Sequence, residues 1–122
     1  NDVKGAAAKF AEVANNSKYE QPYRDLALIR QTVAEYDSLK PQVVIDRLKG
    51  LTNPNSPWLG TAGELVAAAY LKAGNRAEAG RLYGQIAQGG EKVPESIRQR
   101  TVQLAGVLGV DAIDQSKETK AK

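Results

Sequence analysis

The sequence from Pro57 to Gln88 reads PWLGTAGELVAAAYLKAGNRAEAGRLYGQIAQ, and Gly74-Asn75 divides it into two halves. Proline suits the first turn of a helix, and glycine allows the chain to turn sharply between two helices. Segment 57–88 therefore predicts a helical hairpin. Apolar residues recur at helical spacing in both halves, in the sets Trp58, Ala62, Leu65 and Ala69, and Ala79, Leu82, Tyr83 and Ile86.

The same pattern occurs once more, 35 residues earlier, over residues 22–51. A step so close to the ~34-residue tetratricopeptide period indicates stacked helix pairs, none of which can bury its apolar face alone. We therefore predict two repeat-like hairpins, 22–51 and 57–88. The matched positions are Pro22-Tyr23 with Pro57-Trp58, Ala27 with Ala62, Val44 with Ala79, Leu48 with Tyr83, and Leu51 with Ile86.

Helical periodicity continues on both sides of the hairpins, which predicts flanking helices over residues 2–15 and 94–108. No stretch alternates apolar and polar residues long enough to indicate a strand. The sequence therefore predicts one all-α domain over residues 1–110, with about six helices in antiparallel pairs and a tetratricopeptide-like right-handed arrangement. Residues 111–122 lack large apolar groups, apart from one isoleucine, and are expected to form a disordered polar tail.

The composition excludes several kinds of chemistry. The 122 residues include no His and no Cys, so imidazole bases, thiolate nucleophiles and the usual zinc sites are impossible. The carboxylates form no evident cluster for acid–base catalysis or for a hard metal ion. We therefore expect a protein that is not an enzyme and that has no catalytic residue, metal or cofactor.

The charge balance bears on the class of partner. Lys and Arg number 17 against 14 Asp and Glu, so the net charge is only +3. A basic surface from Arg76, Arg81, Arg98 and Arg100 is diluted by neighbouring glutamates, and no aromatic residue is interleaved to stack on bases. We therefore expect no nucleic-acid binding, although a soluble cytosolic helical-repeat adaptor or a nucleic-acid-associated protein remains the alternative interpretation.

Several short motifs carry a resemblance to a known family. The second hairpin follows the tetratricopeptide pattern in its order of aromatic, glycine, acidic and small residues. Together with these motifs, the region from Phe10 to Gly109 resembles the tetratricopeptide-like domain of the ancillary Sec-translocon subunit family. The motifs are Pro22-Tyr23-Arg24-Asp25-Leu26-Ala27, Asn55-Ser56-Pro57-Trp58, Ala62 with Glu64, and Leu71-Lys72-Ala73-Gly74.

The resemblance implies a location and a set of partners. Members of that family carry a helical domain on the periplasmic side of the bacterial inner membrane, anchored by an N-terminal transmembrane helix. The expected partners are Sec translocon subunits, secretory chaperones or their clients. The chain starts at Asn1 without a methionine, which agrees with removal of such an anchor and equally with any other truncation. The resemblance therefore implies an anchor upstream of Asn1, since the given sequence has no run of ~18 apolar residues.

Two groups of residues are candidates for the binding surface and for the core. Peptide-binding repeats use the inner side of the first helix of each pair. The first or the sixth helix would close this groove if it filled the concave side. Tyr23 and Trp58 are expected to pack in the core, and the alternative is that they contact a bound peptide. The groove candidates are Ile29, Val33, Tyr36, Glu64, Ala68, Leu71 and Lys72, and the core candidates are Tyr23, Trp58, Ala79 and Tyr83.

Overall fold

The computed structural model describes residues 2–110, and within this range the chain is all-α, which confirms the predicted fold class. Three 3-10 helices, η1 (Tyr36–Ser38), η2 (Lys49–Leu51) and η3 (Gly90–Lys92), lie between the α-helices. The predicted polar tail, 111–122, lies outside the described residues. The α-helices are α1 (Val3–Ala14), α2 (Gln21–Glu35), α3 (Pro41–Leu48), α4 (Leu59–Lys72), α5 (Arg76–Ala87) and α6 (Glu95–Val107).

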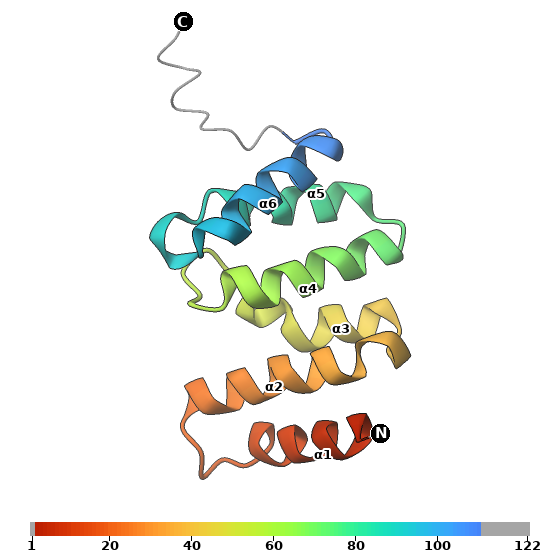
Figure 1. Ribbon diagram of the computed structural model, residues 1–122, viewed down its shortest axis with the longest axis vertical. Coiled ribbons are helices and arrows are strands. Elements are labelled where there is room, and N and C mark those ends of the chain that lie inside the picture. Colours follow the sequence, from red (N-terminus) through yellow and green to blue (C-terminus); the bar gives the residue numbers. More distant parts are fainter. Residues whose placement is uncertain (1, 111–122) are drawn as a thin grey trace, which may run out of the picture.

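The helices are stacked along the long axis of the molecule, from α1 at one end to α5 and α6 at the other (Figure 1). The helix starts recur regularly. α1, α3 and α5 begin at Val3, Pro41 and Arg76, which are 38 and 35 residues apart, and the starts of α2, α4 and α6 are 38 and 36 residues apart. A pair of helices is therefore the unit that recurs along the stack.

The pairing of α2 differs from the expected hairpin over residues 22–51. α2 packs chiefly against α1 and meets α3 over few residues. The face of α1 toward α2 carries alanines such as Ala7 and Ala11, and small side chains let two helices approach closely. η1 and the extended backbone at Leu39 and Lys40 then separate α2 from α3.

The main core lies between α3, α4 and α5. Its largest fully buried side chains include Leu48, Leu59 and Ile86. Ala62 and Ala79 are also fully buried, and their small size allows α4 and α5 to approach closely. Ala7 and Ala27 of the α1–α2 pair are buried too, but they do not belong to this cluster. The hydrophobic core is therefore concentrated in the C-terminal two thirds of the stack.

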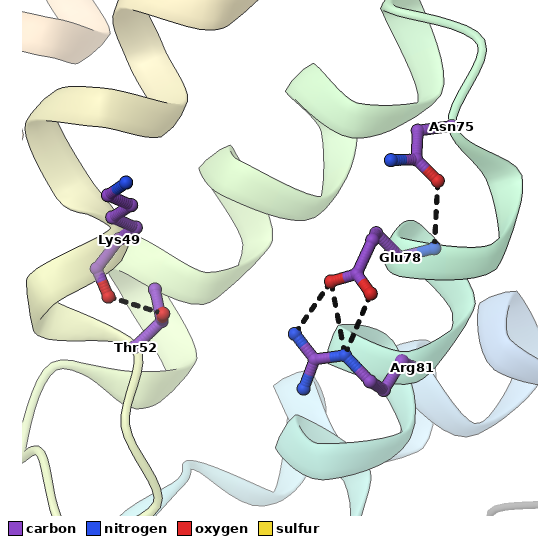
Figure 2. Close-up of polar contacts among 5 residues, drawn as sticks. All are labelled: Lys49, Thr52, Asn75, Glu78 and Arg81. Carbon is purple, nitrogen blue, oxygen red and sulfur yellow. Dashed lines mark hydrogen bonds and ion pairs between the residues drawn. The ribbon is translucent and has the colours of Figure 1, made fainter.

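Polar contacts lie at the end of η2 and at the start of α5, as Figure 2 shows. Gly74 has φ of +82° between α4 and α5, a conformation that glycine adopts without strain. The Asn75 side chain then accepts a hydrogen bond of 3.2 Å from the Glu78 backbone N–H, which caps α5. At the end of η2, the Thr52 hydroxyl donates to the Lys49 carbonyl at 2.7 Å. These contacts fix where the chain turns.

Candidate functional site

A hollow of about 370 Å³ lies between α1, α2 and α4, and we name it the α2–α4 groove. Apolar side chains form most of its wall, with one guanidinium group and one hydroxyl group among them. Two of the predicted groove residues, Ile29 and Val33, belong to the lining. The residues that line it are Phe10, Leu26, Ile29, Arg30, Val33, Ala34 and Thr61.

The helical spacing of α2 creates one wall of the groove. Leu26, Ile29, Arg30 and Val33 follow each other at positions i, i+3, i+4 and i+7, which places them along one stripe of the helix. Ile29 is only 6% exposed, whereas Val33 is 55% exposed. The stripe therefore runs from the core to the solvent, and neither α1 nor α6 covers Val33.

The predicted residues of α4 lie beside the groove and do not line it. Glu64 accepts two hydrogen bonds from Arg100 of α6, at 2.7 and 2.8 Å, and so links α4 to α6. The Lys72 amino group lies 4.5 Å from the ring centroid of Tyr36, at the other end of α4. Ala68 and Leu71 are half-buried. The predicted groove residues therefore form two groups. Ile29 and Val33 line the hollow, and the others lie on the surface beside it.

Two tyrosines lie beneath this surface. The Tyr36 hydroxyl is buried and has no hydrogen-bond partner within the described range. Burial raises the pKa of Tyr36, and the charge of Asp37 adds to the shift. Burial likewise raises the pKa of the Tyr83 phenol, followed by the charges of Glu64 and Tyr36. Both phenols are therefore held in the neutral form, which does not suit them for use as bases at neutral pH.

The four core candidates occupy different environments. Ala79 and Tyr83 are buried, and Trp58 is partly buried against the main core. The prediction for Tyr23 is wrong, because its side chain is 61% exposed. Tyr23 lies one turn before Leu26 on α2, on the side that carries the groove. It therefore extends the exposed apolar stripe of α2.

Sequence reasoning missed Arg30, which lines the groove. Its side chain is exposed and has no hydrogen-bond or ion-pair partner within residues 2–110. The signal was available, because Arg30 lies between the candidates Ile29 and Val33 on the same stripe. Phe10, Leu26 and Thr61 were missed as well, and their contribution depends on how α1, α2 and α4 meet.

The four arginines considered for a basic surface are mostly engaged in contacts within the protein. Arg81 binds the Glu78 carboxylate, and this hydrogen bond, more than the charge alone, lowers the pKa of Glu78 (Figure 2). Arg98 donates to the Val93 carbonyl at 3.1 Å, and Arg100 binds Glu64. Only Arg76 of these four lacks a partner in the described part of the chain. The four guanidinium groups thus do not form one free cationic patch.

The described residues contain neither a metal-binding cluster nor a membrane-spanning helix. In residues 2–110, no three carboxylates come together in a way that could hold a metal ion. Within the same range, no helix has both the length and the apolar character required to cross a bilayer. Comparisons of the chain with protein-family models, with curated proteins and with solved structures give no match.

Proposed function

We propose that this protein is a non-catalytic scaffold that binds other proteins through the α2–α4 groove. The observation that carries the proposal is the open apolar stripe of α2, with Val33 exposed and Ile29 beneath it. When a partner covers an exposed apolar side chain next to a hollow, the burial of that side chain is energetically favourable and stabilises the complex. The stacked helix pairs provide a rigid frame for such a surface.

We further propose that the domain is a tetratricopeptide-like right-handed repeat of the ancillary Sec-translocon type. Two features support this: the short motifs of the sequence, and the recurrence of helix pairs every 35 to 38 residues. Its partners are then Sec translocon subunits, secretory chaperones or their clients. On this proposal the domain lies on the periplasmic side of the bacterial inner membrane and reaches the membrane only through a segment upstream of Asn1.

A nucleic-acid-associated role gains no support from the arginines. Arg81, Arg98 and Arg100 bind groups of the protein itself, and Phe10 is the one aromatic ring in the lining of the groove, so bases have few surfaces on which to stack. A cytosolic adaptor would use the same groove. The sequence of the gene upstream of Asn1 distinguishes the two locations, because only the envelope proposal requires an apolar segment of about 20 residues there.

Photo-crosslinking from single positions in the parent cell tests the proposal. A crosslinking amino acid is placed at Val33 or at Lys72, and the control position is Val107 of α6, which is 76% exposed. We expect translocon subunits or secretory chaperones to be captured from the first two positions and not from Val107. Equal capture from all three positions would contradict the groove, and capture of cytosolic proteins alone would contradict the envelope location.

A further inference from the structure

We infer that the α2–α4 groove selects acidic segments of its partner, in which a bulky apolar side chain has carboxylates on both sides. This inference rests on the proposed function and specifies the chemistry of the partner for the same groove. It follows from two observations: an apolar hollow of limited size, and two cations near it that have no carboxylate partner in the described part of the chain.

The hollow provides the apolar half of the recognition. Phe10, Leu26 and Ile29 contribute its wall, and Val33 stands exposed beside them. Its volume of about 370 Å³ is near the lower limit for ligand pockets. A space of this size fits one bulky side chain, and a whole helix is too large for it. Tyr23, one turn further along α2, can cover the backbone that carries this side chain.

Arg30 and Lys72 provide the charged half. Arg30 lies within the lining and binds no other group in residues 2–110. The Lys72 amino group is held over the Tyr36 ring, at 4.5 Å from its centroid, and binds no carboxylate in the same range. Arg30 and Tyr36 are six positions apart in the chain, which corresponds to about 9 Å along a helix. The two cations therefore lie on opposite sides of Val33 along the stripe.

The carboxylates of the neighbouring elements do not neutralise these cations. Glu64 binds Arg100, and Glu35 binds Arg47 at 2.6 Å. Asp37 lines a separate hollow, between α1 and the end of α2, together with Glu35, and its charge also acts on the Tyr36 phenol, but it forms no ion pair with Lys72. Arg30 and Lys72 therefore remain without an ion-pair partner in the described residues, beside the apolar side chain of Val33. Charge complementarity favours a partner segment with acidic residues and disfavours a basic one.

Peptide titrations followed by NMR of the whole chain test the inference. Three short peptides share a central phenylalanine and differ in the residues beside it, which are acidic, neutral or basic. We expect the acidic peptide to shift the amide signals of Arg30, Val33 and Lys72 and to bind about tenfold more tightly than the neutral one. Replacing its phenylalanine by alanine is expected to weaken binding by a similar factor.

Protein variants locate the charge effect. Arg30→Glu is expected to weaken binding of the acidic peptide by about tenfold or more. Arg76→Glu is the matched control, because Arg76 is also an exposed helical arginine without a partner in the described range, and it should leave affinity unchanged. If Arg30→Glu disturbs the dispersion of the amide spectrum, Arg30→Gln removes the same charge more gently.

Each contrary outcome has its own meaning. Equal affinity for the three peptides, with no effect of Arg30→Glu, would overturn the acidic preference and leave the groove as a protein-binding site. If no peptide shifts the groove signals, the inference is wrong, and the crosslinking from Val33 decides separately on the proposed function. Displacement of the acidic peptide by a single-stranded oligonucleotide at ~0.15 M salt would assign the cations to nucleic acid instead.

Discussion

At the scale of single residues, Tyr23 and Trp58 both follow a proline but have different surroundings. Trp58 packs against the main core, whereas Tyr23 is 61% exposed. We predict that Trp58→Ala lowers the free energy of unfolding by about 2 to 3 kcal/mol, since it removes a large, partly buried side chain. Tyr23→Ala is expected to change it by less than about 0.5 kcal/mol. Urea unfolding measures both, and equal losses would contradict the assignment.

The error at Tyr23 shows what an internal repeat in a sequence cannot specify. The 35-residue alignment placed Tyr23 opposite Trp58, but α2 begins at Gln21 and α4 at Leu59, which are 38 residues apart. In the structural register Tyr23 corresponds to Thr61, and both are exposed. The difference of three residues arises within the helix pairs, because α3 begins 20 residues after the start of α2, whereas α5 begins 17 residues after the start of α4. Periodicity locates a helix, but it does not count the residues of a loop.

The raised pKa values of Tyr36 and Tyr83 predict how the stability of the protein changes at alkaline pH. Burial raises the pKa of both phenols, so the unfolded chain loses these protons at a lower pH than the folded chain does. Titration of the two phenols is therefore expected to leave the free energy of unfolding unchanged below pH ~10 and to lower it as the pH rises above that value. Thermal unfolding across this range measures the effect.

Phenylalanine variants separate this titration from that of the lysines. In Tyr36→Phe/Tyr83→Phe the alkaline loss of stability should be smaller than in the original chain, because neither ring can ionise. Tyr36→Phe should also be no less stable at neutral pH, since the Tyr36 hydroxyl is buried without a partner within residues 2–110. Tyr19→Phe alters an exposed ring and is the control. Identical alkaline profiles for all variants would contradict the prediction.

At the scale of elements, the start of α5 depends on one side chain. Asn75 accepts the hydrogen bond from the Glu78 backbone N–H, and it is the only side chain that caps an α-helix start within the described range. We predict that Asn75→Ala costs about 1 kcal/mol of unfolding free energy, and Asn75→Gly only a few tenths. Chemical denaturation measures both variants. Equal costs for alanine and glycine would indicate that the cap contributes little.

The elements also show which parts of the fold and of the site a sequence can predict. The six helices follow from apolar stripes, because side chains three and four residues apart share a helix face. The pairing of α2 with α1 does not follow, because alanines such as Ala7 and Ala27 fit many neighbours equally well. Ile29 and Val33 were predicted from their stripe, whereas Thr61 joins them only through the packing of α4.

At the scale of the whole molecule, the stack consists of two regions with different amounts of core. α3 to α6 share one large cluster of buried apolar residues, to which α2 contributes Ile29. α1 and α2 pack mainly on each other, through small side chains. Apart from Ile29, the links across the boundary include the ion pair of Glu35 with Arg47 and the contact of Lys72 with Tyr36. The groove lies at this boundary, where α2 and α4 meet.

This difference predicts how the molecule opens locally. Regions with few buried apolar contacts open at a lower free energy than the global unfolding does. We therefore expect backbone amides of α1 and α2 to exchange with deuterium faster than those of α4 and α5.

Glu35→Gln removes the charge that binds Arg47, so it should accelerate exchange in α1 and α2 and leave α4 and α5 nearly unchanged. Glu78→Gln breaks an ion pair within α5 and is the matched control. Equal protection of all helices would contradict the two regions, and a loss of protection spread evenly by Glu35→Gln would indicate a single cooperative unit.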